Sequence, residues 1–278
     1  MSDKPIDRPK PVFRKVSGAT ASRVLRRRES VPVEIPLNAP APTFSPLYRQ
    51  IRVLLLESLK AGEWKPGEAI PTEPELAVRF RVSQGTVRKA VDELASDNLL
   101  VRRQGKGTFV ATHNEERSLF RFLRLAPLQG EVEYPDSELI DSRRTRASAE
   151  IARLLDVRSG ESLVFLRRVL SFQEIPTVVD EISLPAGIFR GFSAQRFNDW
   201  TGSMYGFFET EFGVRIVRAD EDIRAVAADG KTARLLGVPP GSPLLCVDRV
   251  TFTYGDRPVE FRRGLYRTDR HVYRNSLL

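Results

Sequence analysis

Two stretches of helical periodicity, separated by a short break within residues 71–110, constrain the fold of this chain more than any other feature. Apolar residues repeat at helical spacing on both sides of the break, as Leu76, Ala77 and Phe80 and then as Val87, Ala90, Val91 and Leu94. In the break, the Ser83 hydroxyl can accept a hydrogen bond from a free backbone N–H in the first turn of the second helix. The pattern predicts two short helices joined by a tight turn, which is a helix-turn-helix.

The second helix presents a polar face that is suited to reading DNA. This face and the start of the helix carry Ser83, Gln84, Gly85, Thr86, Arg88, Lys89 and Asp92. Small residues allow close approach, amides and hydroxyls can bond base edges, and arginine can bond guanine or phosphate. The pattern therefore favours DNA binding, although two amphipathic helices and a hairpin also occur in α+β domains that do not bind DNA.

A predicted β-hairpin follows the second helix. Strand-like runs at residues 99–103 and 108–110 flank a turn at residues 104–107, which contains two glycines and a lysine. Glycine permits the positive φ that hairpin turns need, and the basic residues can lie along a phosphate backbone. These elements together predict a winged helix-turn-helix at residues 45–112.

Four motifs in this region resemble those of the GntR family of bacterial transcription regulators. They are Pro46-Leu47-Tyr48 with Ile51, Pro71-Thr72-Glu73, residues 83–88 and residues 103–110. The resemblance implies contacts with bases and phosphates at Glu73, Pro74, Ser83, Gln84, Thr86, Arg88, Gly105 and Lys106. Many members have arginine where this chain has Pro74 and Gln84. A glutamine can read adenine but supplies no charge, so two of the implied contacts are changed and the resemblance does not predict the operator sequence.

Length and charge limit the kind of protein. With 278 residues the chain can hold two domains, since one domain takes roughly 100 to 200 residues. The formal net charge of +8 favours an anionic partner without distinguishing DNA from RNA or a membrane surface. No apolar run reaches the roughly 20 residues needed to cross a bilayer, and the N-terminus lacks the apolar core of a signal peptide. We therefore expect a cytoplasmic protein without a membrane partner.

The ends of the predicted domains follow from changes in composition. Residues 1–44 are rich in proline and basic residues without an apolar period, which predicts a disordered basic tail. The cluster Arg26-Arg27-Arg28 suggests the further hypothesis that this tail contacts phosphates non-specifically. A linker with a first strand region is expected at residues 113–137, and the second domain at residues 138–278.

The second half of the chain alternates strand-like and helical stretches, which predicts an α+β domain. It contains an internal repeat, because residues 154–169 are echoed at residues 235–250 and each copy continues into a second strand after Pro176 or Pro258. Two units of one helix and two strands can pair into a single antiparallel sheet. A cleft between the copies would be a natural ligand site.

The order of these elements resembles the UTRA effector domain of the HutC subfamily of GntR regulators, which has the fold of chorismate lyase. Matching pieces include Arg168-Val169, Asp180 with Pro185, residues 202–205, residues 258–260 and residues 266–270. The resemblance implies effector contacts at Arg168, Asp180, Ser203, Glu260 and Tyr266. An arginine suits an anionic group, carboxylates suit amines or hydroxyls, and hydroxyls orient a ligand. The alternative for each residue is a structural ion pair or a surface charge.

The resemblance also bears on the chemistry of the effector. Ligands of this subfamily include organic acids, amino-acid-like compounds and sugar derivatives. Members that bind sugar phosphates often have a second basic residue where this chain has Leu170. A carboxylate-bearing metabolite is therefore favoured over a sugar phosphate.

Two other functions are compatible with parts of the pattern. A chorismate-lyase-like enzyme could use Arg168 with Glu260 as acid or base, but the sequence has no convincing nucleophile and base motif, so no catalytic residue is expected. A DNA-binding architectural protein without a ligand would fill its second domain with apolar side chains. With only His113 and His271, the histidine-rich metal site of other GntR members is not available, and neither a metal nor a cofactor is expected.

The sequence thus predicts an effector-controlled transcription regulator, with repression as the family default. We expect a homodimer, because a twofold protein can place its two helix-turn-helix units in successive major grooves of a palindromic operator. The effector is expected to favour a dimer whose DNA-binding units are wrongly spaced for that operator.

Overall fold

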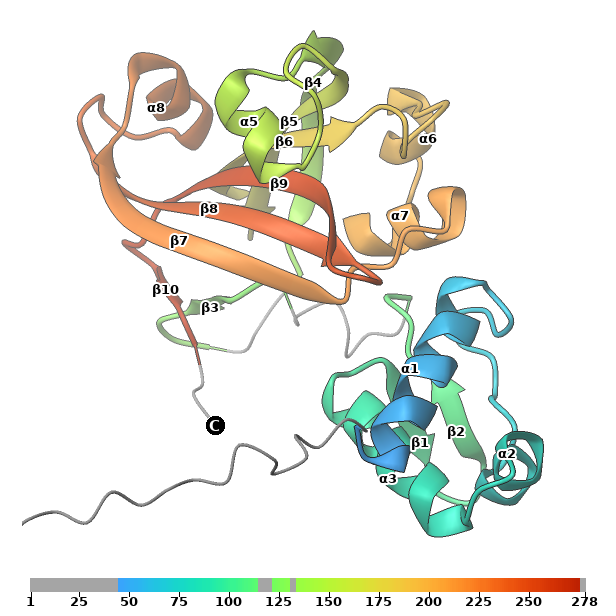
Figure 1. Cartoon of the computed structure of the whole chain (residues 1–278). Coiled ribbons are helices and arrows are strands. Elements are labelled where there is room, and N and C mark those ends of the chain that lie inside the picture. The colour runs from blue at the N-terminus through green and yellow to red at the C-terminus, as the bar shows by residue number, and fades with distance from the viewer. Residues whose placement is uncertain (1–44, 115–121, 131–133, 276–278) are drawn as a thin grey trace, which may run out of the picture. The chain divides into compact units, whose positions relative to one another are not determined.

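Figure 1 shows the computed structural model, which describes residues 45–114, 122–130 and 134–275. The predicted basic tail and its phosphate contacts lie outside the described residues. Within the described ranges, none of the helices is both long enough and apolar enough to span a bilayer. The described chain begins with a helical module and continues into a module built on one large sheet.

The helical module consists of three helices and a two-stranded hairpin. Its elements are α1 (Leu47–Lys60), α2 (Glu73–Phe80), α3 (Gln84–Ser96), β1 (Leu100–Arg103) and β2 (Gly107–Val110). The core combines one apolar stripe from each helix, with Ile51, Leu55, Leu59, Leu76, Val87, Ala90, Val91 and Leu94 among its buried residues. The two strands pair antiparallel, with Arg103 opposite Gly107. The predicted winged helix-turn-helix is confirmed.

Local hydrogen bonds determine where α2 and α3 begin. Thr72 and Glu75 form a capping box at the start of α2, in which the Thr72 backbone N–H donates to the Glu75 carboxylate at 2.7 Å. After α2, Arg81 has a φ of 55°, in the left-handed region that ends many helices. The Ser83 hydroxyl accepts a hydrogen bond from the Thr86 backbone N–H at 3.2 Å. The predicted capping role of Ser83 is therefore confirmed.

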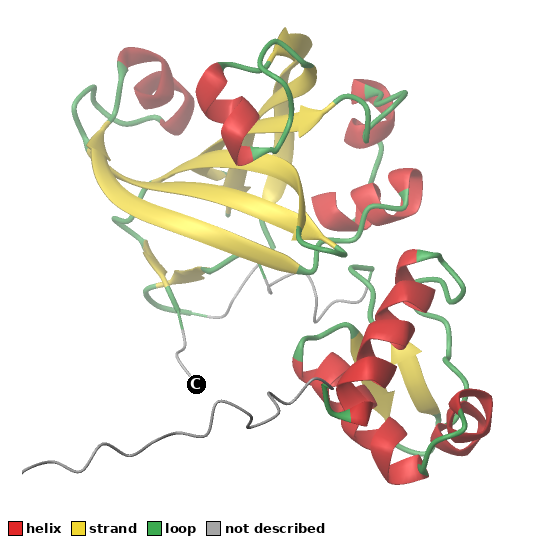
Figure 2. Cartoon of the chain, viewed as in Figure 1, coloured by secondary structure: helices red, strands yellow, loops and turns green. Residues whose placement is uncertain are grey.

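The second module is built on a six-stranded antiparallel sheet with the order β4-β5-β6-β9-β8-β7. These strands are β4 (Asp136–Arg146), β5 (Ser162–Phe172), β6 (Ile175–Pro185), β7 (Arg218–Ala227), β8 (Pro243–Thr253) and β9 (Arg257–Tyr266). A separate ribbon pairs β3 (Leu125–Pro127) with β10 (His271–Tyr273). The described helices, seen in Figure 2, are α5 (Ala149–Leu154), α6 (Ala194–Asn198), α7 (Met204–Phe212) and α8 (Gly230–Leu236). The predicted α+β class with an antiparallel sheet is confirmed.

The order of the strands confirms the internal repeat. One copy contributes β5 and β6 and the other contributes β8 and β9, and the copies join where β6 pairs with β9. The edge strands β4 and β7 pair with β5 and β8. The sequence did not predict β4 and β7, because charged residues interrupt their apolar alternation. Such residues are typical of exposed sheet edges, where they discourage pairing with other chains.

The pleat of the sheet separates its side chains into two faces. On one face, Val164 of β5 packs in the same apolar cluster as Phe208 of α7. On the other face, Val169 of β5 packs in a cluster with Leu236 of α8. Arg168 precedes Val169 and lies an even number of positions from Val164, so its side chain points to the face that α7 covers.

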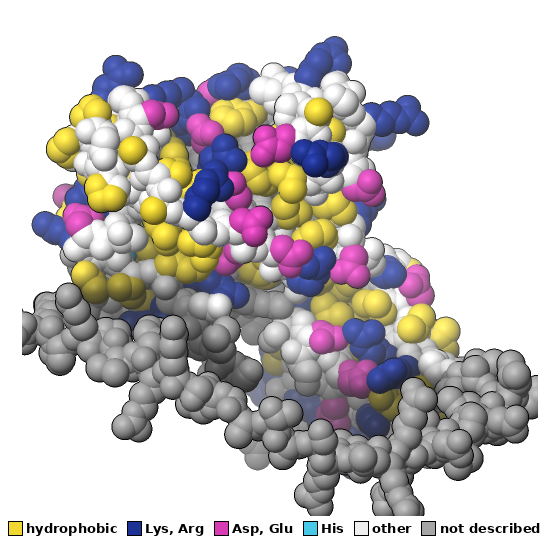
Figure 3. Space-filling view, turned by 60° about the vertical axis from the view of Figure 1, so that its left-hand side comes forward, with side chains coloured by type: hydrophobic (Ala, Val, Ile, Leu, Met, Phe, Trp, Pro, Cys, Tyr) yellow, Lys and Arg dark blue, Asp and Glu magenta, His cyan; other side chains and the backbone are white. Residues whose placement is uncertain are grey.

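Charges of both signs are mixed on the outer surface of the sheet module. Asp248 of β8 pairs with Arg224 of β7 at 2.6 Å and with Arg263 of β9 at 2.7 Å. Figure 3 shows acidic and basic side chains interspersed over the visible face. A surface of this kind attracts neither anions nor cations strongly.

Candidate DNA-binding face and effector cavity

The first turns of α3 present several of the side chains predicted to contact DNA. Ser83, Gln84 and Arg88 are exposed, and Thr86 is half-buried. The hydroxyl groups of Ser83 and Thr86 lie 2.8 Å apart and share a hydrogen bond. Ser83 therefore serves as a helix cap, whereas Gln84 and Arg88 are exposed in the first turns of α3, the part of a recognition helix that contacts base edges.

Glu73, at the start of α2, connects α3 with the hairpin. Its Oε2 accepts a hydrogen bond from Arg88 Nε at 2.9 Å and a longer one from Gln84 Nε2 at 3.4 Å. Its Oε1 accepts a hydrogen bond from Arg102 Nη2 at 2.9 Å. The structure thus brings three predicted residues together and adds Arg102, which the sequence analysis did not single out. The signal available for Arg102 was its place in the basic strand that leads into the turn.

The hairpin that follows α3 in the chain presents a positive charge at its turn. Gly105 has a φ of 70°, which the turn requires and which glycine adopts at no steric cost. Lys106 is exposed at the tip, and its backbone N–H donates to the Arg103 carbonyl at 2.9 Å. The guanidinium of Arg103 lies 4.5 Å from the centre of the Phe109 ring, which supports the strand beneath the turn. An exposed lysine at a wing tip suits phosphate rather than a base.

In the sheet module, a cavity of about 370 Å³ opens on the face covered by α7. Its described walls come from both copies of the repeat, from α7 and from the segments around residues 122 and 135. The lining residues are Phe122, Leu123, Tyr134, Pro135, Ser137, Arg168, Leu170, Thr201, Gly202, Ser203, Met204, Tyr205, Arg249, Arg262 and Tyr266. Three arginines therefore meet in a cavity whose other walls are mostly aromatic or apolar, with the hydroxyls of Ser137, Thr201 and Ser203 as polar exceptions. None of the described lining residues carries a carboxylate.

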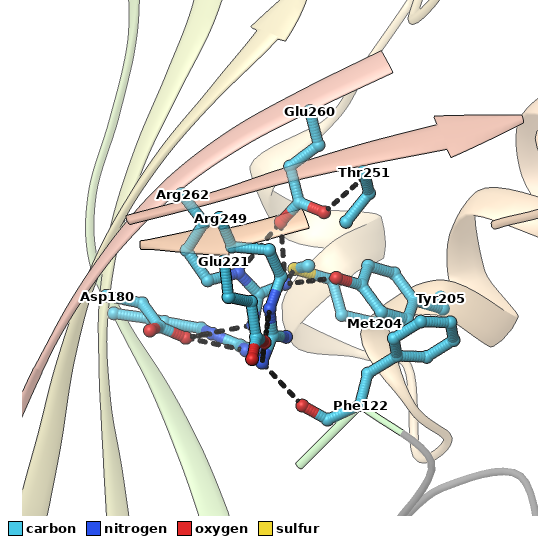
Figure 4. A network of polar contacts seen from close by, with 10 residues as sticks. Phe122, Asp180, Met204, Tyr205, Glu221, Arg249, Thr251, Glu260 and Arg262 are labelled. Atoms are coloured by element: carbon cyan, nitrogen blue, oxygen red, sulfur yellow. Dashed lines mark hydrogen bonds and ion pairs between the residues drawn. The ribbon is translucent and has the colours of Figure 1, made fainter. Parts of the chain in front are cut away.

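Carboxylates lie behind two of these arginines. Asp180 accepts hydrogen bonds at its Oδ2 from Arg168 Nε at 2.9 Å and Nη2 at 2.8 Å, and from Arg262 Nη1 at 3.3 Å. Glu260 accepts from Arg262 Nε at 2.8 Å and from the Thr251 hydroxyl at 3.0 Å. Figure 4 shows Arg262 between the two acids. Nη1 of Arg168 has no hydrogen-bond partner among the described residues, so it remains available to a ligand.

The third arginine, Arg249, is held by a different acid. Its Nε donates to the Glu221 carboxylate at 2.6 Å, and its Nη2 donates to the Phe122 carbonyl at 2.6 Å. Glu221 also accepts a hydrogen bond from the Tyr273 hydroxyl at 2.5 Å. The sequence analysis missed Arg249, although the internal repeat contained the signal. Arg249 occupies the position in the second copy that Arg168 occupies in the first.

Burial and charge shift the titration of this cluster. Burial by itself would raise the pKa of Asp180, but Arg262 and Arg168 outweigh it and hold the pKa below its usual range. Burial raises the pKa of Tyr266 to about 12, and it also raises the pKa of Tyr205. Near neutral pH Asp180 is therefore ionised, and Tyr205 and Tyr266 remain neutral hydrogen-bond donors.

The residues predicted to contact an effector divide into two groups. Arg168, Ser203 and Tyr266 line the cavity, whereas Asp180 and Glu260 are fully buried behind its arginines. Ser203 caps α7 by accepting the Gly206 backbone N–H at 2.9 Å, and its hydroxyl donates to the His113 carbonyl at 3.3 Å. Contact between any of them and an effector stays a prediction. The geometry adds Arg249 and Arg262 as two further charged side chains that line the cavity.

Comparisons with known proteins agree with both halves of the structure. Residues 47–110 match the gntR family of bacterial regulatory proteins, and residues 131–272 match the UTRA domain. The chain is 29% identical to the HTH-type transcriptional repressor NagR of Bacillus subtilis over 229 residues, which cover 82% of this chain and 93% of NagR. It is 30% identical over 227 residues to a protein assigned as the repressor of the fructoselysine utilization operon in Escherichia coli K12, covering 81% of this chain and 91% of that protein.

A solved structure is similar to the second module at higher identity. It is the ligand-binding domain of a protein from Bordetella bronchiseptica that is assigned to the GntR family of transcriptional regulators. The two sequences are 54% identical, and the match covers 57% of this chain and 98% of that domain, with a TM-score of 0.55. The module with the arginine-lined cavity is thus similar to a domain described as ligand-binding.

Proposed function

Because the chain belongs to the GntR family of transcription regulators, with a UTRA domain as its effector module, we propose that it is a repressor released from its operator by a small organic acid. The family membership expected from the motifs is confirmed, and with it a ligand-responsive, DNA-binding regulator. Binding to DNA would place its site of action in the cytoplasm.

The observation that supports an acid as effector is the distribution of charge around the cavity. Arg168, Arg249 and Arg262 line it, and the acids that neutralise them lie behind. A carboxylate that enters the cavity meets guanidinium groups already fixed in place, and charge-assisted hydrogen bonds of this kind are about twice as strong as neutral ones. The ligand gains affinity because the arginines do not have to be ordered when it binds.

The rest of the lining narrows the class further. Phe122, Pro135, Leu170 and Met204 offer an apolar wall to the body of the ligand. Leu170 stands where sugar-phosphate-binding members often have a second basic residue. The charged side chains of the described lining are arginines, which suit the carboxylate of a ligand. An acid with an apolar body therefore fits better than a sugar phosphate.

The structure also bears on the two alternative functions. An acid–base mechanism with Glu260 requires that this carboxylate reach a substrate, but Glu260 is fully buried, bonded to Thr251 and Arg262, and does not line the cavity. A ligand-free architectural protein would fill this space with apolar side chains, whereas the space is lined by arginines. Both observations favour a regulator over either alternative.

On DNA, we propose that two copies place α3 in successive major grooves of a palindromic operator. Gln84 and Arg88 would read base edges, and Lys106 would contact phosphate. Effector binding would then favour a dimer with wrongly spaced DNA-binding units, and such a coupling is typically worth about 1–3 kcal/mol.

Fluorescence anisotropy with the purified full chain tests this proposal. The labelled duplex would come from the region upstream of its own gene, and the competitors would be acids paired with matched amides and α-amino acids, such as phenylpropanoate, phenylpropanamide and phenylalanine. We expect salt-dependent, sequence-specific binding that acids release and that their amides do not. Release by the amide as strongly as by the acid would contradict the charge argument. Absence of sequence-specific binding would contradict the regulator itself.

A further inference from the structure

Glu73 places a negative charge on the surface that is proposed to bind DNA. A carboxylate there repels phosphate, yet this one lies at the start of α2 among three side chains that are suited to bind DNA. Its side chain is only 19% exposed, whereas those of Arg88 and Arg102 are 57% and 43% exposed. The acid is thus partly enclosed by the arginines that it holds.

Both oxygens of Glu73 are already engaged. Oε1 accepts from Arg102, and Oε2 accepts from Arg88 and Gln84. A glutamate that reads cytosine accepts a hydrogen bond from the base amine. Side chains of the protein already occupy three of the roughly four acceptor positions of the Glu73 carboxylate, so its contacts favour a role within the protein over a direct base contact.

The geometry points to Glu73 as a positioning residue that makes DNA binding selective. It fixes the direction of Arg88 from α3 and of Arg102 from β1, and it neutralises part of their charge while no operator is bound. Random DNA, which offers only phosphate, must compete with this acid for both arginines. The operator also offers base acceptors to Arg88. Replacing the Glu73 carboxylate by DNA as the partner of Arg88 is therefore more favourable on the operator than on random DNA. This inference rests on the proposed DNA-binding function.

Asp92 provides a matched control within the same surface. Its Oδ1 lies 2.7 Å from Arg102 Nη1, so it also pairs with Arg102, but it pairs with no side chain at the start of α3. Replacing either acid removes one negative charge close to the same arginine. Only the loss of Glu73 also releases Arg88, so the two variants separate a general charge effect from positioning.

The test compares wild-type full chain with the variants Glu73→Gln, Glu73→Asp and Asp92→Asn. Anisotropy titrations across salt would use an operator duplex selected from random DNA by the wild-type protein and a scrambled duplex of the same length. For Glu73→Gln we expect affinity for the scrambled duplex to rise about three- to tenfold at low salt, and the ratio of operator to scrambled affinity to fall about tenfold. Asp92→Asn should raise scrambled binding while leaving that ratio within about twofold.

Glu73→Asp keeps the charge but shortens the side chain, so it cannot reach both arginines. It should leave scrambled binding near the wild-type level and still lower the affinity ratio. An unchanged ratio in Glu73→Gln and Glu73→Asp, with wild-type melting temperatures, would overturn the inference. So would a loss of discrimination at one base pair only, which would show a direct base contact. If the wild-type protein selects no operator from random DNA, both the proposed DNA-binding function and this inference fail. That outcome is seen before any variant is compared, so it can be told apart from a failure of the inference alone.

Discussion

Arginines pair with carboxylates at both the DNA-binding face and the effector cavity, but water reaches the two sets very differently. Arg88 and Arg102 are 57% and 43% exposed in their pairs with Glu73. Arg168 and Arg262 are 9% and 7% exposed in their pairs with Asp180, which is itself buried. The arginine–carboxylate pairs of Glu73 are therefore accessible to solvent, whereas those of Asp180 lie in the protein interior.

This difference in burial determines what each set of arginines can do. An exposed ion pair contributes about 0–1 kcal/mol, so an arginine at the DNA-binding face can exchange its carboxylate for phosphate or a base at small cost. Removing one partner of a buried pair typically costs about 3–5 kcal/mol, because the other charge is left without compensation. The cavity arginines thus keep their acids, and we expect them to bind a ligand with the donors that remain. The arginines of the DNA-binding face can exchange their partners, whereas the arginines of the cavity are held in place by theirs.

The largest effect is expected for Asp180→Asn. It should lower the free energy of unfolding of the sheet module by about 3–5 kcal/mol, because Arg168 and Arg262 lose their shared counter-charge inside the protein. Urea unfolding followed by tryptophan fluorescence measures this. The chain has two tryptophans, so a Trp64→Phe background leaves Trp200 to report on the sheet module alone.

The control is Glu211→Gln, which removes a more exposed pair with Arg196 at 2.6 Å in the same module. Its loss should cost no more than about 1 kcal/mol. Similar small losses in both variants would mean that burial does not distinguish the pairs, and the comparison between the two regions would fail.

The pH dependence of the same variant sharpens the comparison. Because the arginines hold the pKa of Asp180 below its usual range in the folded protein, its contribution to stability is fully present above the unfolded value of about 3.9. That contribution is lost as the pH falls through the lower native pKa. The difference in unfolding free energy between wild type and Asp180→Asn should therefore be constant above about pH 5 and shrink at lower pH. A difference that does not change with pH would show that lost packing, not charge, destabilises the variant.

A smaller effect is expected for Arg88→Ala, which should weaken operator binding by about 1–3 kcal/mol and leave the melting temperature unchanged. Its pair with Glu73 is exposed, so the fold loses little, whereas base readout loses a donor. Anisotropy with the operator duplex and thermal unfolding of the same sample measure both quantities. If the variant keeps both the wild-type affinity for the operator and the wild-type melting temperature, Arg88 does not contact the operator.

The smallest effect is expected for Lys106→Ala. A lysine at the tip of the wing is expected to contact phosphate, so the variant should bind operator and scrambled duplexes more weakly by the same factor. The slope of log affinity against log salt should become less steep by about 1. A change in the ratio of operator to scrambled affinity would instead assign Lys106 a part in base recognition.

Much of the architecture could be predicted because its determinants are local in the sequence. The stripes from Leu76 to Leu94 predict two helices, and the Ser83 cap confirms where the second begins. The glycines of the wing turn predict the hairpin. The repeat of residues 154–169 at residues 235–250 predicts paired copies in one sheet. Each of these signals depends on side chains a few positions apart, or on the similarity of two segments, and both can be read without coordinates.

Which charged residues meet was decided only by the tertiary structure. Arg168, Arg249 and Arg262 come from β5, β8 and β9, and the register of these strands brings them to one cavity. Glu260 shares a face with Arg262 and Tyr266, yet it lies opposite Thr251 and behind the guanidinium of Arg262, so it does not line that cavity. The sequence determines which residues carry charge and which face of a strand they occupy. The sequence by itself does not determine which of these side chains line the cavity. That depends on long-range packing, which places the arginines in the cavity wall and buries the acids Asp180 and Glu260 behind them.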